Sequence, residues 1–148
     1  MDKKFQTIKI IHRAYEDLGE HEEVAEVTVY RGADLHRNIN FAYRVTQNLE
    51  GSWSRGKYMA DGDLNDDYNP WVKSIKPLKV DEDGKEWGHR STSGGDVFVL
   101  DTGEAYTFAR HGLHRIHLDK ILKLDSREDY LGDELLDEIR FKVEDIRI

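Results

Sequence analysis

The chain has 148 residues, no cysteine, and 30 acidic against 22 basic side chains, which give a formal net charge of −8. This length is usual for one domain, and the lack of cysteine excludes a disulfide-stapled fold and a thiolate metal site. The negative charge disfavours direct nucleic-acid binding, and no apolar run is long enough for a signal peptide or a membrane span. We therefore expect a single cytosolic domain over residues 1–148.

The N-terminal region predicts two strands joined by a polar turn. Residues Phe5–Ile11 and Val24–Arg31 alternate between apolar and polar side chains, which is the period of a strand with one buried face. The residues between them, Glu16–Glu23, are mostly acidic and read as a turn. We expect the two strands to pair antiparallel.

The period then changes to that of a helix over residues 35–50. Asp34 is placed to cap the first turn, and Gly51 follows as a stop signal at the end. The apolar side chains at helical spacing are Leu35, Ile39, Ala42, Tyr43 and Val45 or Leu49.

Residues 52–77 form the least regular stretch, and a loop of this length is usually functional or partly structured. Its rings belong to Trp53, Tyr58, Tyr68 and Trp71. These rings either form a contact surface, because Trp and Tyr are common in binding hot spots, or fill the core beneath the loop. The residues leave both interpretations open.

The C-terminal half predicts a β-hairpin followed by a helix. Gly95–Leu100 and Glu104–Ala109 are strand-forming runs separated by a short glycine-bearing loop. Ile75–Val80 precedes them as a short edge strand, because Pro77 has no N–H for a central ladder. From Asp125 onward the pattern is that of an amphipathic helix. Its apolar face consists of Leu135, Leu136, Ile139, Val143 and Ile146.

These elements together predict an α+β fold. We expect a small, mostly antiparallel sheet with one central helix and a C-terminal amphipathic helix, packed on the sheet or presented outward.

Two segments have some features of a metal site. His111, His114 and His117 recur at intervals of three before Asp119, but on a strand His114 points away from the other two. Asp61–Asp67 has the acidic composition of a calcium loop, yet it lacks the glycine and the glutamate that such a loop requires. We therefore predict no metal ion and no cofactor.

Ser91–Gly95 has the hydroxyls and glycines of a phosphate-binding turn, but the Gly-Lys-Ser/Thr ending of a P-loop is absent. No nucleophile elbow or His-Glu-x-x-His segment occurs, so the residues favour a binding protein over an enzyme. A hydrolase built from dispersed side chains such as His89, Asp96 and His111 stays open. The main alternative is a protein that sequesters or hydrolyses a small nucleotide-like ligand. Its predicted contacts are Arg90, Ser91, Ser93 and His111.

The acidic face of the C-terminal helix, with Glu128 and Asp129 before it, gives a second alternative, a protein that imitates the spaced phosphates of DNA. The mixed charges of the chain favour an ordinary solvated helix face instead.

The segment Trp87–Val99 contains the run Gly88-His89-Arg90-Ser91-Thr92-Ser93-Gly94-Gly95-Asp96-Val97. It resembles the YodL-like and related small modules of phages, plasmids and integrative elements, in which Gly-(His/Arg)-Ser-x-Ser-x-x-Asp-Val leads into a hairpin. Tyr106–Leu113 resembles the end of that hairpin, with Leu113 where phenylalanine is usual. The likeness covers about thirty residues. It implies an accessory protein of a mobile element, a class without a settled activity.

The resemblance and the aromatic loop together give our functional prediction. We expect a non-catalytic, phage- or mobile-element-encoded protein that binds and modulates a host cytosolic protein, a component of defence or transcription. The predicted contact residues are Trp53, Tyr58, Tyr68 and Trp71.

Overall fold

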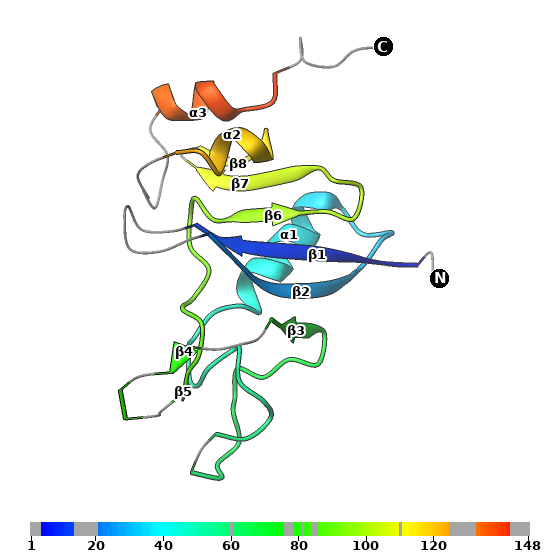
Figure 1. Ribbon diagram of the computed structural model, residues 1–148. Coiled ribbons are helices and arrows are strands. Elements are labelled where there is room, and N and C mark those ends of the chain that lie inside the picture. Colours follow the sequence, from blue (N-terminus) through cyan, green and yellow to red (C-terminus); the bar gives the residue numbers. More distant parts are fainter. Residues whose placement is uncertain are drawn as a thin grey trace.

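The computed structural model of the protein describes residues 4–13, 21–59, 61–75, 79–80, 82–83, 86–109, 111–124 and 133–142. These residues contain a six-stranded antiparallel sheet, one helix after the second strand, and short C-terminal helices (Figure 1). The predicted α+β class is therefore confirmed.

The main sheet has the strand order β3-β2-β1-β6-β7-β8, and each neighbouring pair is antiparallel. Its strands are β1 (Phe5–His12), β2 (Glu22–Tyr30), β3 (Val72–Ser74), β6 (Val97–Val99), β7 (Ala105–Ala109) and β8 (Gly112–Ile116). A separate two-stranded ladder joins β4 (Lys79–Val80) to β5 (Glu86–Trp87). The helices are α1 (Leu35–Arg44), α2 (Leu118–Ile121) and α3 (Asp133–Ile139).

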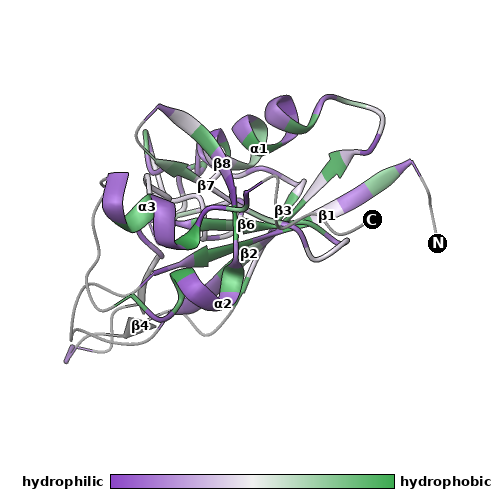
Figure 2. Ribbon diagram, turned by 90° about the horizontal axis from the view of Figure 1, so that it is seen from above, coloured by the Kyte–Doolittle hydropathy of each residue, from purple (hydrophilic) through white to green (hydrophobic). Residues whose placement is uncertain are grey.

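The sheet carries apolar side chains on both faces, because successive residues of a strand point to opposite sides. Phe98 of β6 belongs to one core cluster, with Ile8 of β1 and Ile39 of α1. Its neighbour Val97 belongs to a second cluster, with Leu136 of α3. Figure 2 shows α1 on one side of the sheet and α2 on the other, and α3 packs with α2 in the second cluster. The two clusters therefore fill the two interfaces between the sheet and its helices.

The predicted antiparallel pairing of the first two strands is confirmed, with Phe5 opposite Tyr30 and Ile8 opposite Val27. β1 also pairs with β6, so it lies in the middle of the sheet. Most of the turn predicted between β1 and β2 lies outside the described residues. His12 ends β1 and is only 5% exposed, so a polar ring follows the apolar residues into the interior.

Helix α1 is shorter than the predicted helix over residues 35–50, because side chains end it at Arg44. The Thr46 hydroxyl donates to the Ala42 carbonyl at 2.8 Å, and Gln47 Nε2 donates to the Tyr43 carbonyl at 2.8 Å. These side chains occupy carbonyls that another helical turn would need. Leu49 is consequently 78% exposed rather than on the buried face. Asp34 occupies the N-cap position but makes no side-chain cap hydrogen bond.

The C-terminal helix is also shorter than predicted, since α3 ends at Ile139. Arg140 instead forms a β-bridge with Ile116, and the Phe141 main-chain N–H donates to the Arg115 carbonyl at 2.7 Å. The chain thus leaves the helix to run beside β8. Leu136 and Ile139 are buried as predicted, whereas residues 125–132 and 143–148 lie outside the described part.

The hairpin predicted over residues 95–109 is confirmed as β6 and β7, paired from Val97 opposite Thr107 to Val99 opposite Ala105. The short edge strand predicted at residues 75–80 is confirmed in part, in the two-stranded ladder rather than in the main sheet, where β3 takes an edge position. Of that segment, Lys79–Val80 pairs in the small ladder and residues 76–78 lie outside the described part. No helix in the described ranges is both long and apolar enough to cross a bilayer.

Candidate functional site

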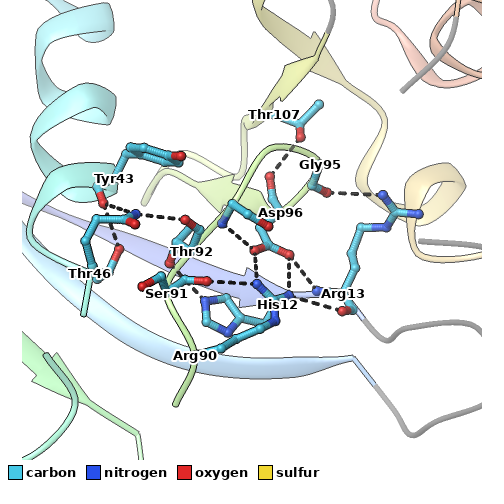
Figure 3. A network of polar contacts seen from close by, with 12 residues as sticks. His12, Arg13, Tyr43, Thr46, Arg90, Ser91, Thr92, Gly95, Asp96 and Thr107 are labelled. Atoms are coloured by element: carbon cyan, nitrogen blue, oxygen red, sulfur yellow. Dashed lines mark hydrogen bonds and ion pairs between the residues drawn. The ribbon is translucent and has the colours of Figure 1, made fainter. Parts of the chain in front are cut away.

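The fully buried carboxylate of Asp96 is the centre of a polar cluster (Figure 3). Its Oδ1 accepts hydrogen bonds from the Arg13 main-chain N–H at 3.0 Å and from Arg90 Nη2 at 2.8 Å. Its Oδ2 accepts from Arg90 Nη1 at 2.7 Å and from the Ser93 main-chain N–H at 2.9 Å. The Thr107 hydroxyl donates to the Asp96 main-chain oxygen at 2.8 Å. Every carboxylate oxygen therefore has two donors, which is the pattern of a fixed structural anion.

This Asp96 cluster joins segments that are far apart in the sequence. Arg13 follows β1, Arg90 and Ser93 lie before β6, and Thr107 lies in β7. The Arg13 side chain is also buried and donates through Nη1 to the Gly95 carbonyl at 3.2 Å. Two arginines and one aspartate thus fix the turn that leads into the hairpin, as a buried ion pair with hydrogen bonds can do.

Three aromatic rings extend the cluster toward the loop that follows α1. His12 Nε2 lies 2.9 Å from the Thr92 hydroxyl, and its ring meets Trp53 edge-on at a centroid distance of 6.2 Å. Trp53 stacks on His89 at 5.7 Å and donates through Nε1 to the Arg90 carbonyl at 2.9 Å. With an exposed fraction of 2%, Trp53 belongs to the core, so its predicted place on a contact surface is wrong. The indole can be buried because its N–H has a hydrogen-bond acceptor in the interior.

The loop after α1 is held by side chains that bind its own main chain. Asp67 Oδ2 accepts from the main-chain N–H of Leu49 at 2.7 Å and of Gly51 at 2.7 Å. Asn65 binds both main-chain groups of Ser52, with Oδ1 accepting at 3.0 Å and Nδ2 donating at 2.6 Å. We call residues 48–59 and 61–71 the clasped loop.

Two glycines allow this loop to pack closely. A Cβ on Gly51 would lie 2.3 Å from Asn65 Oδ1, and a Cβ on Gly88 would lie 2.3 Å from Ser52 Oγ. Gly51 was predicted to stop the helix, and it instead admits the Asn65 side chain. Because Gly88 has no side chain, the loop can pack closely against the segment before the hairpin. The glycine of the Gly-His-Arg-Ser run therefore has a packing role.

Several large side chains of the clasped loop are exposed to solvent. Tyr58 is 60% exposed and Leu64 is 61% exposed, and an isolated β-bridge pairs these two residues. Tyr68 and Trp71 are exposed as well. Three of the four aromatic residues predicted as contacts are therefore available at the surface, and only Trp53 is not.

Trp71 also forms one wall of a groove beside α1. The groove has a volume of about 490 Å³. Its main lining side chains are Phe5, Tyr30, Arg37, Phe41, Arg44 and Trp71, and we call it the α1 groove. Its two arginines were not among the predicted contact residues, although a separation of seven residues on a helix is the signal for a shared face.

A second groove of about 650 Å³ lies between α1 and the turn that joins β7 to β8. Tyr43 and Phe108 line it and contact each other edge-on at 5.4 Å, and His111 stands at its margin with a left-handed φ of 72°. Of the four residues predicted to hold a nucleotide-like ligand, His111 alone lines this groove. Arg90 and Ser93 serve the Asp96 cluster.

Ser91 serves the clasped loop, because its hydroxyl accepts from the Asn48 main-chain N–H at 2.8 Å. His111 precedes β8, His114 lies within it and His117 follows it. The ring of His117 packs against that of Phe141 at a centroid distance of 5.2 Å. Within the described residues, no three His, Asp or Glu side chains gather in a way that would hold a metal ion.

Tyr106 has a raised pKa. Burial and the Glu104 carboxylate, which accepts the Tyr106 hydroxyl hydrogen bond at 2.7 Å, raise the pKa of Tyr106 from 10.0 to about 12. The raised pKa makes Tyr106 stabilising at pH values below 10, where both folded and unfolded chains are protonated. Between pH 10 and about 12 the unfolded chain ionises first, so that stabilisation is lost.

We expect the free energy of unfolding to fall by up to about 2 kcal/mol more in the wild type than in Tyr106→Phe across that alkaline range. Chemical denaturation of both proteins at several alkaline pH values measures the difference. Equal slopes would show that the tyrosine is not shielded in this way.

Comparison of the chain with protein-family models, with curated proteins and with solved structures gives no match.

Proposed function

We propose that this protein is a non-catalytic accessory protein of a phage or mobile element, and that it binds and modulates a host protein in the cytosol. The observation that carries the proposal is the clasped loop. Its main chain is fixed by the buried side chain of Asn65 and the half-buried side chain of Asp67. Three other side chains of the loop extend into solvent, those of Tyr58, Leu64 and Tyr68. A loop that is ordered before binding loses little conformational entropy when a partner docks.

The chemistry of the exposed side chains supports a protein as the partner. Tyr and Trp dominate the energetics of protein interfaces because they bury a large area with few rotatable bonds. Tyr58 and Leu64 lie side by side through their β-bridge and form a small apolar tip. The net charge of −8 disfavours a nucleic acid as the partner of this surface.

Affinity capture from host lysate with wild-type protein and Tyr58→Ser/Leu64→Ser tests the proposal. Both side chains are exposed, so the double variant should keep its melting temperature within about 2 °C. We expect a discrete host protein to be enriched by the wild type and to fall at least about tenfold with the double variant, because hot-spot residues contribute most of an interface energy.

The matched control is Glu134→Ala/Glu138→Ala on the exposed face of α3. It should capture the same host protein as the wild type. Loss of capture with this variant and retention with the loop variant would favour the acidic helix face as the binding surface and contradict the proposal.

A further inference from the structure

The α1 groove has one aromatic wall, and its rings are held in place. Phe5 meets Tyr30 edge-on at a centroid distance of 6.0 Å and meets Trp71 at 5.7 Å. The Trp71 main chain is bonded at both ends, with its N–H donating to Asn69 Oδ1 at 2.9 Å and its carbonyl accepting from Thr28 at 2.9 Å. Tyr30 and Trp71 are nevertheless about half exposed, at 55% and 47%. These rings present a prepared apolar surface to solvent.

The other wall of the α1 groove is positively charged. Arg37 and Arg44 lie on α1 and are both exposed, and no Asp or Glu is among the described residues that line the groove. Among the residues that the structure describes, neither arginine has an ion-pair partner. The α1 groove therefore presents two positively charged side chains to solvent, although the whole chain has a net charge of −8.

We infer that the α1 groove binds an acidic segment of the partner protein, in which carboxylates flank an apolar or aromatic side chain. This inference rests on the proposed function and names the chemistry of its partner. Arginine guanidinium groups bind carboxylates through paired hydrogen bonds, and the aromatic wall buries the side chain between them.

The spacing of the two arginines defines the segment further. Seven residues of α-helix span about 10 Å along the axis, and a peptide in the polyproline II conformation rises about 9 Å in one turn of three residues. Side chains three positions apart in such a peptide lie on the same face, so a polyproline II segment with glutamates at this spacing matches Arg37 and Arg44. A phosphate backbone would also supply anions, but the net charge of the chain repels a long polyanion, so we favour the acidic peptide.

Fluorescence polarisation with a short labelled peptide tests this inference on the full chain. The probe carries Glu-Leu-Phe-Glu at its centre, and two control probes replace the glutamates by lysine or the apolar pair by alanine. We expect the acidic apolar probe to bind and both control probes to bind at least about tenfold more weakly. Binding of a single-stranded oligonucleotide in preference to the peptide would overturn the inference.

Charge reversal at the groove is compared with charge reversal elsewhere. Arg37→Glu/Arg44→Glu should weaken peptide binding at least about tenfold. The matched variant Lys120→Glu/Lys123→Glu makes the same change of charge at exposed residues in and just after α2, and should leave the affinity within about twofold. An equal loss in both variants would show a general charge effect and contradict a groove site.

A glycine substitution tests the aromatic wall without removing any charge. A Cβ on Gly32 would lie 2.7 Å from Tyr30 Cε1, which is the far end of a movable side chain, so Gly32→Ala should displace the ring at little cost in stability. We expect Gly32→Ala to weaken peptide binding severalfold, whereas Gly56→Ala, which meets nothing within 4 Å, should not.

Failure of this inference can be separated from failure of the proposed function. One outcome is that Tyr58→Ser/Leu64→Ser loses the host protein, Arg37→Glu/Arg44→Glu retains it, and no probe binds. The proposed function would then be supported, and the α1 groove would not be part of the interface. The other outcome is that the probes bind as expected and no host protein depends on the clasped loop. The groove would then be supported as a binding site, and the clasped loop would not be the contact surface.

Discussion

Replacing Asp96 by asparagine is expected to lower the free energy of unfolding by about 3–5 kcal/mol. The carboxylate is fully buried and accepts four hydrogen bonds, two of them from the guanidinium of Arg90. Asparagine keeps the shape but removes the charge and turns one acceptor into a donor, so the half-buried Arg90 loses its counter-charge and the two N–H groups of Arg13 and Ser93 lose a charged acceptor. Equilibrium denaturation with urea or guanidinium measures the loss.

Thr107→Val provides the matched control for this prediction. It removes only the hydroxyl that donates to the Asp96 main-chain oxygen at 2.8 Å, and it keeps the branched shape of the side chain. This variant should cost about 1 kcal/mol. If Asp96→Asn costs no more than Thr107→Val, the carboxylate does not organise the turn before the hairpin.

Replacing Trp53 by alanine is expected to cost about 3–5 kcal/mol as well, because it empties a large site in the core. The ring is 2% exposed, stacks on His89 and donates to the Arg90 carbonyl. Trp53 also ties the clasped loop to the sheet, since its ring meets that of His12 in β1 at a centroid distance of 6.2 Å. Thermal unfolding, with amide hydrogen exchange of the loop, measures both consequences.

Trp71→Ala is the control for Trp53→Ala, since the same side chain is lost from a site that is 47% exposed. We expect it to cost no more than about 1 kcal/mol and to leave loop exchange unchanged. Similar losses of stability in the two variants would contradict the assignment of Trp53 to the core and of Trp71 to the surface.

The regular elements with a clear period were predictable from the sequence. β1, β2 and the β6–β7 hairpin alternate strictly enough to show their buried faces. The end of α1 was not predictable by period, because Thr46 and Gln47 end it through side-chain bonds to carbonyls. β3 has only three residues and depends on pairing with β2, which no local pattern reveals.

The candidate site was predictable only in its residue types. The aromatic content of the loop indicated a packed or binding segment, but which ring enters the core depends on partners far along the chain. Trp53 is buried because Arg90 offers a carbonyl 37 positions away. In the same way, Asp96 meets the Arg13 main chain across 83 positions. Such contacts follow from the topology of the sheet rather than from spacing in the sequence.

The central claim is that the clasped loop is rigid before binding and presents exposed side chains to a partner. Amide hydrogen exchange of this loop in the free wild-type protein tests that claim most directly. The N–H groups of Gly51, Ser52 and Trp53 each donate to a side-chain oxygen at 3.0 Å or less. We predict that these amides exchange at least about tenfold more slowly than in an unstructured peptide. Exchange at the rate of an unstructured peptide would contradict a loop that is ordered before it meets a partner.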